Sequence, residues 1–176
     1  LPARRSFAEL GFTELCQSVV LAASALLLCT PSARRELPTV SLLMFTLIVA
    51  SLIREQDYYL DRHLFDGAWQ LLVTLVLLPC LTLVLWRRQR FSSEFVTYGN
   101  SFSFGLFAAG FLVTYVFSRL YGRSEMWMAI LEDHYLRTFK EAAEEITELL
   151  GYSLILIAVI ELVLLSRRWQ QARSLP

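Results

Sequence analysis

The sequence predicts an all-α integral membrane protein, a bundle of five transmembrane helices with its N-terminus outside and its C-terminus in the cytoplasm. Of the 176 residues, 56% are hydrophobic and only 18% are charged, whereas about a quarter of a soluble domain is charged. The mean hydropathy is +0.50, and the apolar residues form long runs, typical of helices that cross a bilayer. Sixteen basic residues balance 16 acidic ones. This composition excludes a disordered chain and lacks the basic excess of a nucleic-acid-binding protein.

Five segments are long enough to cross the hydrocarbon core, which is about 30 Å thick. We place them at residues 13–30, 38–60, 67–86, 99–118 and 144–166, within a single helical domain that covers residues 1–176. Pro31 and Pro38 bracket the first turn, because proline is tolerated at helix ends. The apolar run of the second segment ends early, so we expect its helix to continue through Arg54–Leu60. A short interfacial helix around Glu125–Arg137 is expected before the fifth span.

The orientation follows from three arginine pairs that share one side under a five-span count: Arg34-Arg35, Arg87-Arg88 and Arg167-Arg168. Basic residues next to transmembrane helices favour the cytoplasmic side. The opposite side holds 13 acidic and 8 basic residues, a charge of −5, whereas the side of the arginine pairs has a charge of +6. The remaining acid, Glu161, falls within the fifth span. These counts predict an acidic outer face and a basic cytoplasmic face, with the lipid bilayer as the chain's immediate partner.

Small residues recur every four positions along the fourth span, at Ser101, Gly105 and Ala109. Such a pattern allows two transmembrane helices to approach closely. We therefore expect this face to pack against another helix.

The outer side concentrates the polar residues. Glu141, Glu144, Glu145 and Glu148 have the spacing of one helix face, and Tyr152 continues that face by one turn. Carboxylates so close together repel one another unless cations or arginines neutralise them, and Arg54 and Arg119 stand at the outer ends of their own spans. We predict a charged network of eight residues: Arg54, Glu55, Asp57, Arg119, Glu144, Glu145, Glu148 and Tyr152. The alternative is a solvated acidic face beside the membrane.

A divalent metal site is the sharpest version of this hypothesis, with His63, His134, Glu145 and Glu148 as ligands. Carboxylates and imidazoles suit Zn, Mn or Fe, and helix bundles build such sites from separate helices. The spacing of a known metal motif, such as HExxH, is missing from the sequence. The two histidines would then be ordinary residues of the membrane interface. A haem with two histidine ligands is disfavoured, because both histidines fall outside the predicted spans.

Three stretches carry a resemblance to a known group of proteins: Arg54–Tyr58 (REQDY), Phe117–Gly122 (FSRLYG) and Glu144–Tyr152 (EEITELLGY). With them, the chain resembles small multi-pass inner-membrane proteins of proteobacteria, over most of its length. The resemblance implies a location in the bacterial inner membrane. It implies no activity.

Three hypotheses for the function follow. The leading one is a non-enzymatic subunit or accessory protein, whose charged network faces the periplasm and binds a cation or a partner, either another membrane subunit or a second copy of the chain. The second is a metal-dependent membrane hydrolase for a lipid-like substrate, with Glu55 or Asp57 as the general base. The third is a proton or cation pathway through Glu14, Glu55, Glu148 and Glu161.

Overall fold

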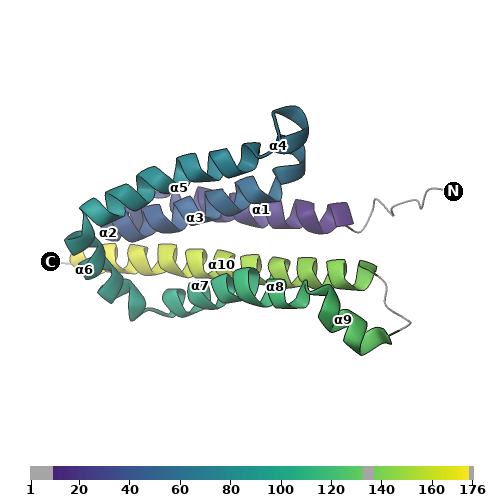
Figure 1. Ribbon diagram of the computed structural model, residues 1–176. Coiled ribbons are helices and arrows are strands. Elements are labelled where there is room, and N and C mark those ends of the chain that lie inside the picture. Colours follow the sequence, from purple (N-terminus) through teal and green to yellow (C-terminus); the bar gives the residue numbers. More distant parts are fainter. Residues whose placement is uncertain (1–9, 133–136, 175–176) are drawn as a thin grey trace.

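We describe the chain from a computed structural model, which places residues 10–132 and 137–174. Every secondary-structure element in these residues is helical. Five helical segments are long and apolar enough to cross a membrane: α1 (Leu10–Leu28), α3 (Pro38–Glu55), α5 (Ala68–Trp86), the continuous segment of α7 (Phe102–Leu112), η1 (Val113–Phe117) and α8 (Ser118–Tyr121), and α10 (Arg137–Ser174). Figure 1 shows that they run along one common direction. The predicted all-helical class and the number of candidate spans are confirmed.

Four short helices lie at the two ends of the molecule (Figure 1). At one end are α4 (Asp57–His63) and α9 (Ser124–Leu131), near the start of α10. We call it the Glu148 end. At the other are α2 (Pro31–Glu36) and α6 (Arg88–Gly99), which the sequence analysis did not predict. We call it the Glu94 end.

The second predicted span, residues 38–60, is wrong at its C-terminal boundary. The helix α3 ends at Glu55, and α4 begins at Asp57 as a separate helix. At the break, the backbone N–H of Gln56 bonds to the carbonyl of Ile53 at 3.1 Å, a tightened last turn. Asp57 is an acidic residue in the first turn of α4, where a negative charge is favourable. The polar stretch after Glu55 therefore forms a helix of its own.

Other boundaries also differ: the first helix is α1, Leu10–Leu28, rather than residues 13–30, and the fourth and fifth segments differ as well. The fourth segment begins at Phe102 rather than at residue 99, because the Ser101 hydroxyl accepts a hydrogen bond from the N–H of Phe104 at 3.2 Å and caps the helix. The fifth helix was predicted at 144–166, yet α10 has 38 residues, or about 57 Å at 1.5 Å per residue. It absorbs Arg137, so the interfacial helix expected at 125–137 is only α9. A helix of this length extends beyond any hydrocarbon core.

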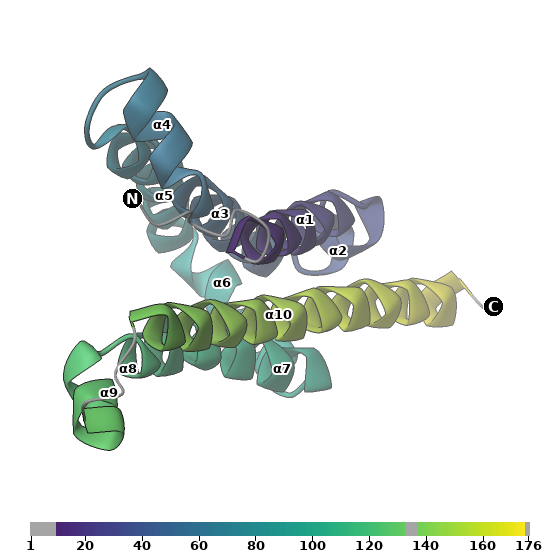
Figure 2. The same ribbon diagram turned by 90° about the vertical axis from the view of Figure 1, so that its right-hand side faces the viewer.

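The long helices pack in the order α5, α3, α1, α10 and α7, with each in contact with the next. Figure 2 shows α10 between α1 on one side and α7 on the other. The helix α5 packs mainly on α3, and few of its residues are buried. The last helix of the chain thus joins the two halves of the bundle.

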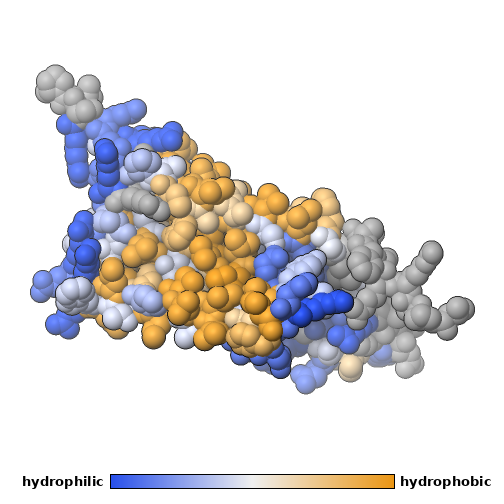
Figure 3. Space-filling model, turned by 90° about the horizontal axis from the view of Figure 1, so that it is seen from above, coloured by the Kyte–Doolittle hydropathy of each residue, from blue (hydrophilic) through white to orange (hydrophobic). Residues whose placement is uncertain are grey.

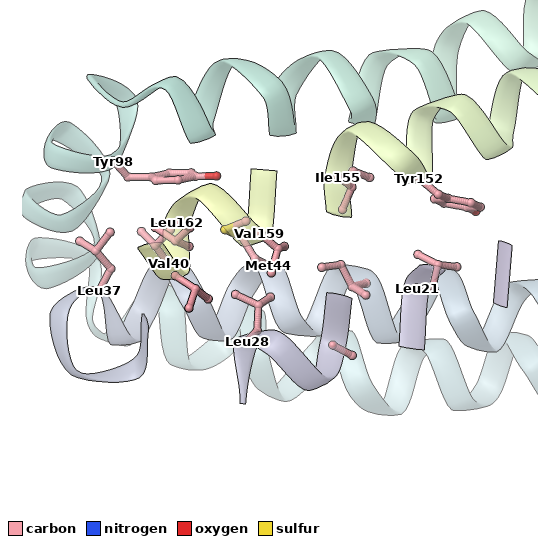
Figure 4. Packing of buried hydrophobic residues seen from close by; sticks show 13 residues of the cluster. Leu21, Leu28, Leu37, Val40, Met44, Tyr98, Tyr152, Ile155, Val159 and Leu162 are labelled. Atoms are coloured by element: carbon pink, nitrogen blue, oxygen red, sulfur yellow. The ribbon is translucent and has the colours of Figure 1, made fainter. Parts of the chain in front are cut away.

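The buried core lies where α1, α3, α6 and α10 meet (Figure 4). From α10 it takes residues spaced three or four apart, which form one face of the helix: Tyr152, Ile155, Val159 and Leu162. Leu21 and Leu28 of α1 face them, and Val40 and Met44 of α3 complete the layer. The same face of α10 that carries the carboxylates near its start therefore continues as the core.

The helices α7 and α10 approach each other closely, and this contact does not use the predicted small residues Gly105 and Ala109. Gly105 and Ala109 are exposed, and a Cβ at Gly105 would meet nothing within 4 Å. A Cβ at Gly110 would instead lie 2.7 Å from the carbonyl oxygen of Gly151. Ser103, on the same buried side, donates a hydrogen bond to the carbonyl of Ala158 at 2.8 Å. The prediction had the right helix but the wrong face. Small residues lie on more than one face of this helix, and the sequence alone does not say which face meets a partner.

Hydrophilic and hydrophobic residues separate along the length of the molecule. On the face in Figure 3, hydrophobic residues form a band across the middle, and hydrophilic residues gather at the two ends. Exposed apolar side chains are abundant on the long helices, among them Leu71, Leu75 and Leu78 of α5. A face of this kind is suited to contact with lipid rather than water.

Candidate functional site

The candidate site lies at the Glu148 end, where α10 brings its carboxylates next to α3 and α8. Glu144, Glu145 and Glu148 are half-buried or buried, and the Tyr152 side chain is completely buried. Only 7% of Glu148 is exposed. A carboxylate this deep must be paired, since an isolated buried charge costs several kcal/mol.

Arg54, in the last turn of α3, reaches across to α10. Its Nη2 atom lies 2.9 Å from Glu55 Oε1 and 3.1 Å from Glu148 Oε1, and it donates to the Tyr152 hydroxyl at 3.2 Å. The Tyr152 hydroxyl in turn donates to Glu55 Oε1 at 2.6 Å. One guanidinium, two carboxylates and one phenol thus form a closed set of contacts. With Arg119, we call these residues the Arg54 cluster.

Arg119 approaches the same carboxylate from α8. Its Nη2 atom lies 3.4 Å from Glu148 Oε1, and its Nη1 atom lies 2.9 Å from Glu144 Oε1. The second oxygen of Glu144 lies 3.4 Å from Lys140 Nζ, one turn earlier in α10. Just over half of the Arg119 side chain is exposed, against a fifth of Arg54. The cluster therefore has a buried side at Arg54 and an open side at Arg119.

The π-helical turn η1 places a second tyrosine beside the cluster. The Tyr115 ring lies under the Arg54 guanidinium, with 5.5 Å between the guanidinium carbon and the ring centroid. Its hydroxyl bonds to Ser51 of α3. Ser118, just after η1, lies with its hydroxyl 3.4 Å from Glu148 Oε1. Such turns often occur at functional sites, and this one turns Tyr115 towards α3 while Ser118 faces α10.

Charges within the Arg54 cluster balance. Two guanidinium groups, from Arg54 and Arg119, meet the two carboxylates of Glu55 and Glu148. A buried set that is paired and hydrogen-bonded fixes geometry, and removing one partner leaves a charge uncompensated. What this arrangement does chemically is to lock α3, α8 and α10 together at one end.

Three residues of the predicted network lie outside the Arg54 cluster: Glu144, which pairs with Arg119 and Lys140, and the two acids Asp57 and Glu145. Asp57 is exposed at the start of α4, where its carboxylate accepts a hydrogen bond from the N–H of Tyr58. The Glu145 side chain is half-buried and makes no ion pair within the described part of the chain, while its carbonyl accepts a hydrogen bond from Gln17 Nε2 at 3.0 Å. The charges of Glu145 and Glu14 repel each other. Within the described residues, the carboxylates of Asp57, Glu145 and Glu14 therefore have no cation that neutralises them.

The structure describes three of the four predicted metal ligands, His63, Glu145 and Glu148. His134 lies outside the described residues. His63 ends α4 as an exposed side chain, with its Nδ1 atom 2.9 Å from the carbonyl oxygen of Tyr59. Over residues 10–132 and 137–174, no group of three or more His, Cys, Asp or Glu side chains could hold a metal ion. Glu148 is already paired with two arginines, Arg54 and Arg119. Because His134 is not described, the four-ligand site stays a prediction.

A second buried carboxylate, at the Glu94 end, was missed by the sequence analysis. Glu94 of α6 accepts hydrogen bonds from the N–H groups of Thr39 and Val40, at 2.7 and 3.0 Å, and pairs with Arg90 at 3.0 Å. It thereby caps the N-terminus of α3 from a different helix. The signal was indirect: Leu37, before Pro38, has no side-chain oxygen to cap α3 itself.

Comparisons of the chain with protein-family models, with curated proteins and with solved structures find no match. The resemblance to small inner-membrane proteins of proteobacteria therefore stays a prediction.

Proposed function

We propose that the chain is an integral protein of the bacterial inner membrane, with the Glu148 end in the periplasm and the Glu94 end in the cytoplasm. Five apolar helices and the hydrophobic band of Figure 3 support insertion. The arginine pairs support the orientation, because Arg87 and Arg88 lie where α5 meets α6 and Arg167 and Arg168 lie near the end of α10, all at the Glu94 end. Exposed tryptophan supports insertion, since Trp86 directly precedes Arg87 and tryptophan is typical of the membrane–water interface.

Within that membrane, we propose a non-enzymatic accessory subunit that binds a basic partner at its periplasmic face. The observation that carries this proposal is the division of the outer charges. The Arg54 cluster neutralises its own carboxylates, whereas exposed acids around it have no ion pair within the described residues: Glu14, Asp57, Asp66, Glu125 and Glu132. The cluster holds the helices in place, and the surplus acids remain for a positively charged group.

Electrostatic attraction of this kind favours association and orients the partner. It also predicts that binding weakens with salt, since charges at a surface are screened beyond about 10 Å at 0.1 M. A protein partner is favoured over a single cation, because the surplus acids are spread over α1, α4, α9 and the residues just after α4 and α9, instead of meeting at one point.

The experiment is site-specific photo-crosslinking in intact cells. A photoreactive residue replaces Tyr59 of α4 or Met128 of α9, both exposed at the Glu148 end, and Val96 of α6 serves as the control at the other end. We expect one discrete crosslinked protein from Tyr59 and Met128, and none of the same mass from Val96. The combined change of Glu14, Asp57 and Glu125 to their amides should abolish it. The same product from Val96, or an unchanged yield in the amide variant, would overturn the proposal.

A cation is the competing occupant, and it has its own measurement. Ca²⁺ or Mg²⁺ is added to the purified protein while its thermal unfolding is followed. Stabilisation of the wild type, lost in the amide variant and without any crosslinked protein in cells, would replace the partner by a cation. No response to either ion, together with a discrete crosslink, supports the partner.

A further inference from the structure

A cavity of about 340 Å³ lies at the Glu94 end, where the end of α1, the start of α3 and the end of α5 meet. Its walls are mainly apolar, with Leu42 and Phe45 from α3 and Leu83 from α5. Arg87 stands at its α5 side, one turn after Leu83. We call it the α3–α5 groove. Its volume lies at the lower limit for small-molecule sites, enough for part of a ligand.

From this groove we infer a binding site for one anionic phospholipid of the cytoplasmic leaflet, with its phosphate on Arg87 and an acyl chain on Leu42, Phe45 and Leu83. The inference rests on the proposed membrane insertion and orientation. It adds a lipid ligand at the end of the molecule opposite to the proposed partner surface.

The depth of the groove supports a lipid. Trp86, which is 84% exposed, immediately precedes Arg87, and tryptophan beside arginine is typical of the headgroup level. Leu83 lies one turn further along α5 towards the apolar middle of the helix. A phospholipid presents its phosphate and its first methylenes with the same spacing and in the same order.

The charges of the groove support an anionic lipid. A guanidinium forms paired hydrogen bonds with a phosphate. Arg90 is already paired with Glu94, but Arg87 and Arg88 are exposed and make no ion pair within the described chain. The cytoplasmic leaflet carries the anionic lipids, and basic pockets between helices on that side bind their headgroups. The second cavity at this end, about 450 Å³ and lined by Glu36 and Glu94, has no such excess of positive charge.

The test uses the full chain, purified in a mild uncharged detergent, with native mass spectrometry and thermal unfolding as readouts. Phosphatidylglycerol and phosphatidylethanolamine of equal chain length are added in turn. We expect one bound phosphatidylglycerol, at least a tenfold preference over phosphatidylethanolamine, and a higher unfolding temperature. Soluble glycerol phosphate should not stabilise the protein at the same concentration, because it lacks the chain.

Three variants locate the site. Arg87→Gln removes the phosphate contact, and Leu83→Trp fills the groove. Arg168→Gln removes an exposed arginine at the same end that does not line the groove. We expect the first two to lose the preference and the third to keep it. Arg87→Gln leaves the apolar walls of the groove unchanged, so it tests the site even if Leu83→Trp does not fold.

Equal binding of both lipids, a preserved preference in Arg87→Gln, or the same loss in Arg168→Gln would overturn the lipid site. Stabilisation by glycerol phosphate equal to that by phosphatidylglycerol would overturn the lipid as ligand. Each of these results leaves the crosslinking at Tyr59 and Met128 unaffected. Recovery of the chain in the soluble fraction of cells would overturn both proposals together.

Discussion

Arg54 Nη2 lies 3.1 Å from Glu148 Oε1 and so joins the last turn of α3 to the start of the membrane-length part of α10, 94 positions later in the chain. Both helices contribute side chains to the core, such as Met44 and Val159, but they pack mainly through α1, which contacts each of them. The pair is therefore a direct polar link between two helices that pack mainly through a third, and the Tyr152 hydroxyl, bonded to both Arg54 and Glu55, keeps it in place.

Removing Arg54 should destabilise the protein far more than removing an exposed arginine. Arg54→Gln leaves Glu55 and Glu148 with one fewer cation, and breaking such a buried pair costs about 3–5 kcal/mol. The measurement is unfolding in mixed micelles of dodecyl maltoside and sodium dodecyl sulfate. The matched control is Arg137→Gln, whose partner Glu141 is four residues away on an exposed face, and it should cost about 0.5 kcal/mol.

A double-mutant cycle separates pairing from packing. If Arg54 and Glu148 act as a pair, adding Glu148→Gln to Arg54→Gln should cost much less than Glu148→Gln alone. Strictly additive losses would contradict the pairing. Arg119 lies 3.4 Å from the same Glu148 oxygen and still stabilises that carboxylate in Arg54→Gln. The coupling energy of the cycle therefore measures the interaction of Glu148 with Arg54 alone.

The sequence predicted the helices well because their signal is local. Runs of apolar residues identify each long helix, and the spacing of Glu144 and Glu148 places both on one face of α10 without any tertiary information. The break at Gln56 was missed because Arg54–Leu60 is compatible with a helix throughout. The end of α3 is decided by how α4 packs beside it, which the sequence does not show.

Contacts between helices could not be predicted in the same way. Arg54 and Arg119 were named as partners for the glutamates, but which carboxylate each would reach depends on how α3 and α8 lie against α10. Glu94 is a clearer case, because its partners Thr39 and Val40 are 55 and 54 positions away. Nothing in the sequence around Glu94 indicates a helix cap, since the helix that it caps is α3.

The contact of α7 with α10 predicts a strong effect of one added methyl group. A Cβ at Gly151 would overlap Thr114 Oγ1 and lie 2.9 Å from the Gly110 carbonyl oxygen. Gly151→Ala should therefore force the helices apart and cost at least about 1–3 kcal/mol, as overpacking does. Gly105→Ala, with nothing within 4 Å, is the control and should be neutral or slightly stabilising.

A second change tests the cause of that loss. Thr114→Ala removes the oxygen nearest to the new methyl group, so it should recover part of the stability of Gly151→Ala, although the Gly110 carbonyl still interferes. Thermal unfolding of the two single variants and the double variant measures this recovery. A double variant no more stable than Gly151→Ala would show that the oxygen of Thr114 is not what the methyl group meets.

Loss of the Glu94 cap should release α6 from α3. Glu94→Gln weakens two hydrogen bonds from backbone N–H groups and the pair with Arg90, and we expect a cost of about 1–2 kcal/mol, as for other helix caps. Hydrogen exchange at Thr39 and Val40 should rise at the same time. Ser93→Ala, at an exposed position next to Glu94, should leave both readouts close to wild type. Unchanged exchange in Glu94→Gln would contradict the capping role.

Tyr98 of α6 predicts how stability depends on alkaline pH. Its side chain is 3% exposed, against Phe104 and Ser103, and this burial raises the pKa of Tyr98 to about 12. The ordinary pKa of tyrosine is about 10, so the folded protein holds this proton more tightly than the unfolded chain. The resulting stabilisation is complete below pH 10 and is lost as the pH rises towards 12.

Tyr98→Phe isolates this contribution, because phenylalanine fills the same space without a proton to lose. We expect the wild type to lose on the order of 2 kcal/mol more than the variant between pH 9 and pH 12, following the shift in pKa. Both proteins are unfolded thermally in detergent across that range, and other tyrosines cancel in the difference. Parallel stability curves for the two proteins would mean that Tyr98 titrates in the folded state as it does in water, and that α6 leaves it accessible to solvent.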